Sequence, residues 1–359
     1  MTPLRAPFPW FGGKRRVAEE VWERFGDVAN YVEPFAGSLA VLLARPHAPK
    51  VETVNDRDGY LVNFWRAVQA QPDAVWAYAD QPVFEADLHA RHVWLIAQSE
   101  FRERILSDPH YYDVKIAGWW VWGLSLWIGD GWCAPCTDRP TDRPTDKATP
   151  CHHAKRAARR PVRKIPELGV NRGVRRDSFQ NSGVGAEFAP SVRPSVRPFQ
   201  PDSCRTSAAQ EWAFTPREHG GVFDDLAERL RDVRIACGDW SRVVTPSVTW
   251  RHGVTGVFLD PPYDDGEHAI AYSGGGHISA NVRAWAIANG NNPELRIALC
   301  GYEGEHVMPD GWSELAWKAQ GGYGSQGDGR GRANRSRERV WFSPHCEAAS
   351  QSLLFEVSA

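Results

Sequence analysis

The sequence predicts an α/β protein in which one doubly wound sheet is interrupted by a second module. Short apolar runs typical of buried strands alternate with segments of helical periodicity in both the early and the late part of the chain. Between them lies a long stretch in which Pro, Arg and Ser dominate and apolar periodicity is absent. A chain of 359 residues allows one large domain with an insertion, or two domains.

Residues 1–71 are expected to form the first part of the sheet domain. Helical periodicity follows Gly12-Gly13-Lys14 and stops near Gly26. A strand, a short helix and a second strand are then predicted over residues 31–35, 39–44 and 51–54. Another helix follows, with Leu61, Trp65 and Val68 on its apolar face.

Residues 72–220 are expected to form the inserted module. Its first part, up to about residue 130, is aromatic-rich and predicted to be helical. The sequence then becomes repetitive and rich in Pro and Arg. Thr137-Asp138-Arg139-Pro140 is repeated at once, and further repeats with Arg and Pro follow. We expect residues 133–205 to be a flexible, low-complexity loop.

Residues 221–345 are expected to complete the sheet domain, and residues 346–359 to be a tail. Helices are predicted over residues 222–232 and 282–288, and strands over residues 233–237, 256–259, 295–299 and 339–342.

Composition limits the possible functions only loosely. A net charge of −2 gives no global indication of nucleic-acid binding, but residues 155–176 hold nine Lys or Arg against one acid, Glu167. This segment and the Gly- and Arg-rich residues 321–337 either contact phosphates or are solvated loops. We find no apolar run of membrane-span length and no signal-peptide core. Seven scattered Cys favour free thiols in a reducing, cytoplasmic compartment.

The stretch Glu33-Pro34-Phe35-Ala36-Gly37-Ser38 has the pattern of a strand, a turn and a helix. A glycine at such a turn lets the backbone approach a ligand closely. Asp56 lies 19 residues after Gly37, at the end of the next predicted strand, where an acid can accept hydrogen bonds from ribose hydroxyls. Asp56 is alternatively the N-cap of the following helix.

Asp260-Pro261-Pro262-Tyr263 follows a buried strand and is the most informative turn in the chain. The prolines remove two backbone donors, so nearby carbonyls remain able to accept from a ligand. The aspartate and these carbonyls can bind an amino group while the tyrosine offers a stacking face. The alternative is a strand that simply ends in a Pro-rich turn.

Five motifs occur together in one order: Pro9-Trp10-Phe11-Gly12-Gly13-Lys14, the glycine turn, Asn55-Asp56, Gly238-Asp239-Trp240 and Asp260-Pro261-Pro262-Tyr263. In this combination the chain resembles the Dam-type, alpha-class family of DNA adenine-N6 methyltransferases. Ser38 stands where many members have a second Gly, and Asp239-Trp240 where the family has Asp-Phe.

The resemblance implies a Rossmann-like doubly wound methyltransferase sheet, a mainly helical target-recognition insertion, and S-adenosyl-L-methionine as cofactor. It places Trp10 and Lys14 at the methionine end and Asp56 at the ribose. The implied cofactor-binding residues are Trp10, Lys14, Glu33, Phe35, Gly37, Asp56, Asp239 and Asp260, and the implied catalytic residues are Asp260, Pro261, Pro262 and Tyr263. Each of three residues also has a purely structural interpretation. Lys14 is alternatively a solvated lysine, Trp10 a contact of the core, and Asp239 a turn residue.

The implied reaction is methyl transfer to the N6 amine of an adenine flipped out of double-stranded DNA. A monomer, or a weak dimer on DNA, is expected. Alternatives are an N4-cytosine or RNA amino-methyltransferase, and a catalytically silent DNA- or cofactor-binding protein. The recognition sequence and the biological role, whether epigenetic marking, restriction-modification or phage self-protection, stay open.

No metal is expected in this reading. Cys133 and Cys136, followed by Cys151-His152-His153, have a zinc-like spacing, but the Pro-rich surroundings favour free thiols.

Overall fold

The computed structural model describes residues 4–8, 10, 13–127, 132–133, 221–263, 278–318 and 337–348, and all of them belong to one compact unit. The expectations for residues 134–220, including the flexible loop and its basic segment, lie outside the described residues. The same holds for residues 319–336 and for the tail beyond residue 348.

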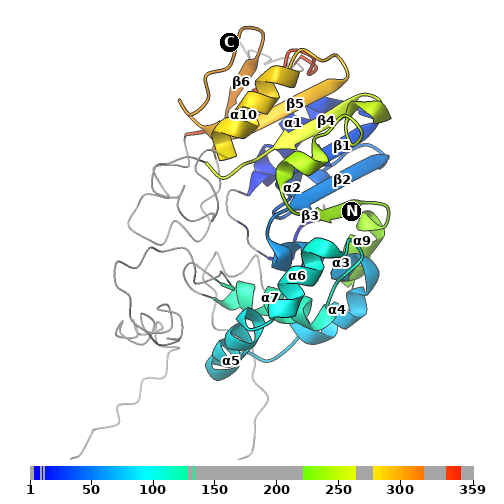
Figure 1. The fold of residues 1–359 in the computed structure, drawn as a ribbon, viewed down its shortest axis with the longest axis vertical. Coiled ribbons are helices and arrows are strands. Elements are labelled where there is room, and N and C mark those ends of the chain that lie inside the picture. The colour runs from blue at the N-terminus through cyan, green and yellow to red at the C-terminus, as the bar shows by residue number, and fades with distance from the viewer. Residues whose placement is uncertain are drawn as a thin grey trace, which may run out of the picture. The chain divides into compact units, whose positions relative to one another are not determined.

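A sheet of seven described strands forms the centre of this unit, in the order β3-β2-β1-β4-β5-β7-β6 (Figure 1). Five neighbouring strands are parallel: β3 (Arg234–Cys237), β2 (Val51–Asp56), β1 (Asn30–Glu33), β4 (Thr255–Leu259) and β5 (Leu295–Tyr302). At the other edge β7 (Glu338–Phe342) runs antiparallel to both β5 and β6 (Ser313–Ala316). The predicted α/β class is confirmed, and the sheet is mixed.

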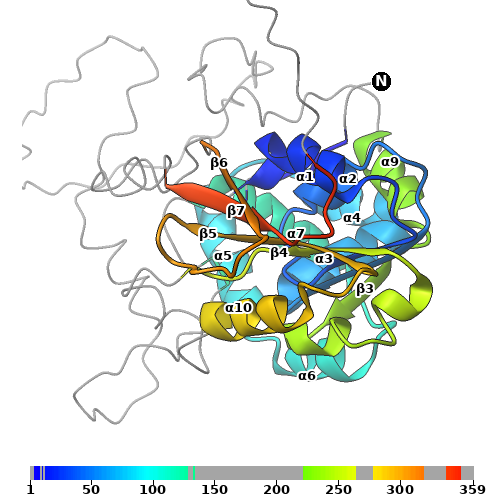
Figure 2. The ribbon, with the colours of Figure 1, turned by 90° about the horizontal axis from the view of Figure 1, so that it is seen from above.

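Both faces of the sheet are buried, because alternate residues of a strand point to opposite faces. Val257 and Leu259 belong to one hydrophobic cluster, whereas Phe258 between them belongs to another. The smaller cluster includes Val282 and Ala286 of α10 (Ile278–Asn289). The larger includes residues of α1 (Ala18–Phe25), α2 (Ala40–Leu43), α3 (Gly59–Ala70) and α9 (Gly221–Leu230). Figure 2 shows α10 on one side of the sheet and α1 and α2 on the other.

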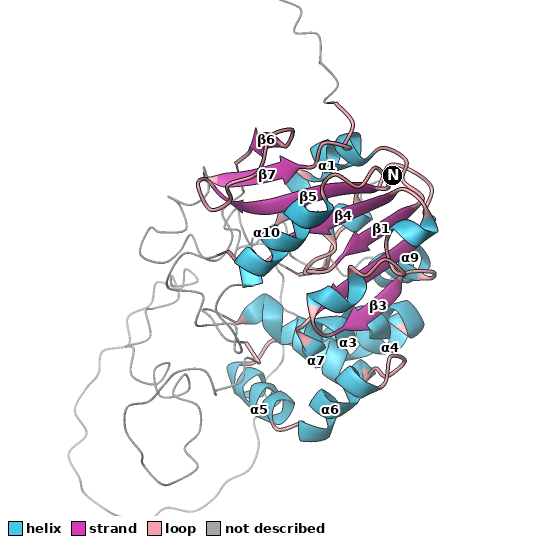
Figure 3. Ribbon diagram, turned by 45° about the horizontal axis from the view of Figure 1, so that its top comes forward, coloured by secondary structure: helices cyan, strands magenta, loops and turns pink. Residues whose placement is uncertain are grey.

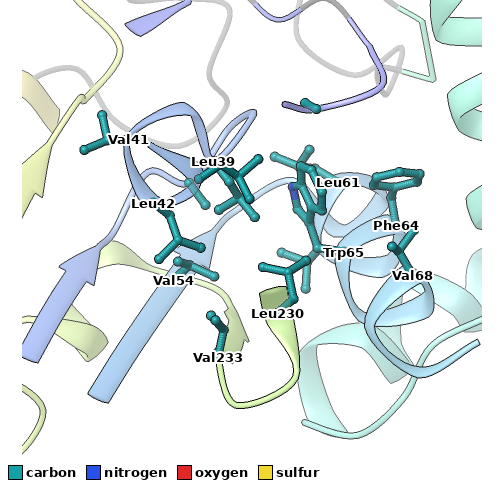
Figure 4. Close-up of a cluster of buried hydrophobic side chains, with 14 of the residues drawn as sticks. Leu39, Val41, Leu42, Val54, Leu61, Phe64, Trp65, Val68, Leu230 and Val233 are labelled. Atoms are coloured by element: carbon teal, nitrogen blue, oxygen red, sulfur yellow. The ribbon is translucent and has the colours of Figure 1, made fainter. Parts of the chain in front are cut away.

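Segments from both ends of the chain share the larger cluster. Figure 4 shows Leu42 and Val54 beside Trp65 of α3, with Leu230 and Val233 completing the group. Leu230 ends α9 and Val233 precedes β3, so residues on either side of the undescribed segment 134–220 pack into one core. The strands that follow residue 221 also belong to the same sheet as β1 and β2, while the predicted domain bounds stay a prediction.

Residues 72–126 are largely helical, as their pattern predicted. Figures 1 and 3 show these helices gathered at the β3 edge of the sheet; they are α4 (Pro72–Ala79), α5 (Glu85–Ile96), α6 (Ser99–Ser107) and α7 (Val114–Leu126). Phe64 of α3 connects them to the core, because its ring centroid lies 5.8 Å from that of Trp120 and 5.9 Å from that of Phe223. A boundary of the inserted module at residue 72 stays a prediction.

Several boundaries differ from those the sequence predicts. A short 3-10 helix (Lys14–Arg16) precedes α1, and β5 continues three residues past the predicted strand end at residue 299. The strand β6 was not predicted at all, because it is a mostly exposed edge strand without apolar alternation. Within the described part of the chain, no helix has the length and apolar character needed to cross a membrane.

Candidate active site

The candidate site lies where the parallel strands end. In a parallel sheet the carboxyl ends of neighbouring strands share one edge, and ligands bind outside it. The strands β2, β1 and β4 end at Asp56, at Glu33 and just before Asp260, and β3 is followed by Gly238 and Asp239. The fold therefore brings together four acids that the sequence singled out separately.

Lys14 lies among these acids and is almost fully buried, with 5% of its surface exposed. Its Nζ lies 3.0 Å from Asp260 Oδ1 and 3.7 Å from Glu338 Oε2. Burial alone would lower the pKa of Lys14, but the negative charges of Asp260 and Glu338 raise it above its ordinary value. The alternative of a solvated surface lysine is therefore wrong.

Asp260 and Tyr263 of the Pro-Pro turn contact each other. The Tyr263 hydroxyl lies 3.1 Å from Asp260 Oδ1 and 2.9 Å from Glu338 Oε2, so it can donate to either carboxylate. The Tyr263 ring packs edge to face against Tyr302, with centroids 4.6 Å apart. Pro261, between them in sequence, is buried, and Pro262 is half-buried.

The glycine turn adopts a conformation that favours glycine. Gly37 has φ +47°, and a Cβ there would lie 2.6 Å from Trp10 Nε1. The Gly37 N–H donates to Asp56 Oδ2 over 3.0 Å, and its carbonyl accepts from Trp65 Nε1 over 3.0 Å. Trp10 and Gly37 therefore lie in close contact.

Asp56 is held by backbone donors on both of its oxygens. Oδ2 accepts from Gly37 N, and Oδ1 accepts from Asp58 N over 2.9 Å. Burial raises the pKa of Asp56 to about 6, although these N–H bonds oppose the shift. The N-cap of α3 is Asp58, whose Oδ1 accepts from Tyr60 N and Leu61 N, so Asp56 is not the cap.

Glu33 and Phe35 flank the end of β1. Glu33 is buried, and its Oε2 accepts from the Tyr31 hydroxyl over 2.9 Å. Burial raises the pKa of Glu33 well above its ordinary value, and the neighbouring charge of Asp260 adds to the shift. Phe35 is half-buried and stacks on Trp240 with ring centroids 6.2 Å apart.

Asp239 is the most exposed of the predicted site residues. It caps a 3-10 helix (Trp240–Val243), accepting from Ser241 N over 3.0 Å. The hydrogen bond from the Ser241 side chain lowers the pKa of Asp239. Its neighbour Gly238 donates its N–H to the carbonyl of Asp56, which places Asp239 beside that acid. The turn role considered for Asp239 is confirmed and does not conflict with binding.

Two further residues, Asn55 and Glu338, hold this site together, and the sequence assigned neither of them a role in it. Asn55 Nδ2 donates to the carbonyls of Pro34 and Gly238, so one amide ties together the ends of three strands. Glu338 comes directly before the predicted strand 339–342, and a charged residue entering a buried strand was the available signal.

Of the residues with zinc-like spacing, Cys133 is among the described residues. Cys133 is buried in the larger cluster, and burial raises its pKa, which opposes a thiolate ligand. Cys136, Cys151, His152 and His153 lie outside the described residues. Where the structure describes the chain, no group of three or more His, Cys, Asp or Glu residues could hold a metal, and its four cysteines are free thiols.

The first half of this site lies in a segment that is similar to a known protein family. Residues 10–113 match the D12 class N6 adenine-specific DNA methyltransferases. A DNA N-6-adenine-methyltransferase of Escherichia phage P1 is 26% identical over 106 residues, which are 30% of this chain and 14% of the phage protein. The family match includes Trp10, Lys14, Gly37 and Asp56, and Asp239 and Asp260 lie outside it. Over its matched residues the chain resembles the D12 class of N6 adenine-specific DNA methyltransferases, which confirms the family resemblance predicted from its motifs.

Proposed function

We propose that this protein transfers a methyl group from S-adenosyl-L-methionine to the N6 amino group of adenine in double-stranded DNA. The observation that carries the proposal is the contact of Lys14, from the matched segment, with Asp260 of the Asp-Pro-Pro-Tyr turn. It joins a segment similar to adenine-specific DNA methyltransferases to a turn suited to bind an exocyclic amine. The mixed sheet, buried on both faces, is compatible with a Rossmann-like methyltransferase fold.

The residues present fit the proposed cofactor. Asp56 already accepts one N–H on each oxygen, and a carboxylate has lone pairs for two further donors, such as the hydroxyls of a ribose. The carboxylates of Asp56, Asp239 and Asp260 at neighbouring strand ends would attract a cationic ligand. When bound, S-adenosyl-L-methionine would supply a methyl group on a positively charged sulfur. The remaining proposed cofactor contacts are Trp10, Lys14, Glu33, Phe35, Gly37, Asp239 and Asp260.

The proposed role of the Asp260 turn is to bind and orient the acceptor amine. The lone pair of an adenine amine is delocalised into the ring, so the amine is a weak nucleophile. The Asp260 carboxylate and the Pro261 carbonyl would accept hydrogen bonds from the two N–H groups of the amine. They would also stabilise the positive charge that develops on the nitrogen. Tyr263 would stack on the base, which must leave the duplex to reach this buried turn.

The DNA is proposed to be selected by the module spanning residues 72–220, of which the helices α4 to α7 are described. A modifying enzyme of this kind would act as a monomer or a weak dimer on DNA in the cytoplasm of a bacterial or phage-infected cell. Epigenetic marking, protection from restriction and phage self-protection are all compatible with this proposal.

Asp260→Asn tests the proposal, because it removes the charge and one acceptor while conserving size. We expect methyl transfer from labelled S-adenosyl-L-methionine to unmethylated duplex DNA to fall roughly 1000-fold. Cofactor affinity should change little, since Asp56 and the glycine turn are untouched. The matched control is Asp310→Asn, an exposed aspartate in the loop before β6, which should transfer at the wild-type rate.

Chromatography of the labelled nucleosides names the methylated base. Label in N4-methylcytosine would mean that the enzyme methylates cytosine. Label in RNA alone would mean that it is an RNA amino-methyltransferase. Cofactor and DNA binding without transfer by the wild-type protein would favour a catalytically silent binder. Equal rates in Asp260→Asn and wild type would refute the assignment of Asp260.

A further inference from the structure

Glu338 is a buried carboxylate in the candidate site that the proposed chemistry does not yet use. It begins β7, and the antiparallel register places it opposite Tyr302 at the end of β5. Only 6% of its side chain is exposed. A residue held on a strand is positioned more precisely than one on a loop. Glu338 is therefore a fixed point beside the Asp260 turn.

Glu338 and Asp260 share the same two donors. The Tyr263 hydroxyl oxygen, which carries a single proton, lies 2.9 Å from Glu338 Oε2 and 3.1 Å from Asp260 Oδ1. The Lys14 ammonium lies within 4.0 Å of both carboxylates. A hydroxyl proton can make only one strong, linear hydrogen bond at a time, so the two acids compete for Tyr263. Because Glu338 binds the Tyr263 hydroxyl and shares Lys14, Asp260 is held less tightly by these two donors.

This competition matters for the second oxygen of Asp260. The closest approach of Lys14 and the hydrogen bond of Tyr263 are both to Oδ1 of Asp260, so Oδ2 is the less engaged of its two oxygens. Because Oδ1 already faces two donors, one for each of its lone pairs, an exocyclic amine has to bind the carboxylate through Oδ2. Without the Glu338 carboxylate, Lys14 and Tyr263 would turn more fully to Asp260 and compete with the amine for both oxygens.

We propose that Glu338 is a positioning residue that holds the Tyr263 hydroxyl, shares Lys14, and so keeps Asp260 Oδ2 available to the acceptor amine. This inference rests on the proposed methyl transfer at the Asp260 turn. It assigns Glu338 to the orientation of the acceptor and not to cofactor binding.

Glu338→Gln tests the inference, because it keeps the shape and an acceptor oxygen but removes the charge that attracts Lys14. Single-turnover transfer to duplex DNA should fall roughly 100-fold, as expected when a reacting group is misplaced. The dissociation constant for S-adenosyl-L-methionine should stay within about threefold of wild type, because a positioning role for the acceptor leaves cofactor binding intact. Glu303→Gln is the matched control, since Glu303 pairs with Arg339 next along β7 but is 60% exposed.

Tyr263→Phe tests the same hydrogen bond from its other side and serves if Glu338→Gln fails to fold. It keeps the ring but removes the hydroxyl through which Glu338 holds it, so the ring is less well positioned and we expect a loss of roughly tenfold in transfer rate. Because the two residues share one contact, the double variant should lose less than the product of the single losses.

The outcomes separate this inference from the proposed function. An active wild type with Glu338→Gln transferring as fast as Glu303→Gln overturns the role of Glu338 alone. An equal loss of cofactor affinity and transfer rate also overturns it, because Glu338 would then belong to the cofactor site. A wild type that transfers no methyl group to DNA overturns the proposed function and this inference together.

Discussion

At the scale of single residues, Asp56 offers a pH dependence that can be measured. Burial raises its pKa to about 6, so the side chain takes up a proton as the pH falls through that value. The ionised form accepts hydrogen bonds on both oxygens, whereas a protonated oxygen becomes a donor. We therefore expect affinity for S-adenosyl-L-methionine to weaken roughly tenfold between about pH 7 and about pH 5.

Titration calorimetry across this pH range checks the expectation. Asp56→Asn supplies the control, because its amide does not titrate and its affinity should be weaker but nearly independent of pH. Asp239 should not contribute, because the hydrogen bond from Ser241 lowers its pKa and it stays ionised. A wild-type affinity that is flat with pH would remove Asp56 from the proposed ribose contact.

At the scale of elements, α3 connects the glycine turn to the helices α4 to α7. Its first turn is capped by Asp58, whose Oδ1 accepts from Tyr60 N over 2.9 Å and Leu61 N over 3.3 Å. Asp58→Ala should lower the free energy of unfolding by about 1 kcal/mol, the usual value of an N-cap. Asp58→Asn retains the acceptor oxygen and should lose much less in denaturant titrations. Equal losses in the two variants would show that the cap does not stabilise α3.

The elements also show what the sequence could and could not predict. The strand β4 and helix α1 were found because an apolar run and a helical period are local signals. The position of Glu338, the first residue of β7, in the site was not predicted. Glu338 contacts Tyr263, which lies 75 residues earlier in the chain, and no local sequence pattern indicates such a contact. The motif residues were placed correctly at the strand ends, but their mutual contacts depend on the order of strands in the sheet.

At the scale of the whole described unit, one buried ion network joins distant parts of the chain. Glu52 of β2 contacts Arg45 over 3.0 Å and Arg229 of α9 over 2.6 Å. The guanidinium groups of Arg45 and Arg229 also donate to the carbonyls of Val28 and Leu42. Because α9 and β2 lie on either side of the undescribed segment 134–220 in sequence, this network ties the early and late parts of the fold together.

Glu52→Gln tests how strongly the two parts are coupled. The amide keeps the size of the side chain but removes the carboxylate that Arg45 and Arg229 share, while Arg45 keeps a contact of 3.7 Å with the exposed Asp27. This change should cost about 3 kcal/mol of unfolding free energy. The matched control is Glu228→Gln on α9, which removes a pair with Arg231 in which both side chains are 65% exposed, and the change should be below about 0.5 kcal/mol. Urea titrations followed by both tryptophan fluorescence and circular dichroism measure the loss. If the two halves of the core fold as one unit, both signals should move together to lower urea in Glu52→Gln. Separate transitions would mean that the late strands and α9 are stable without this network.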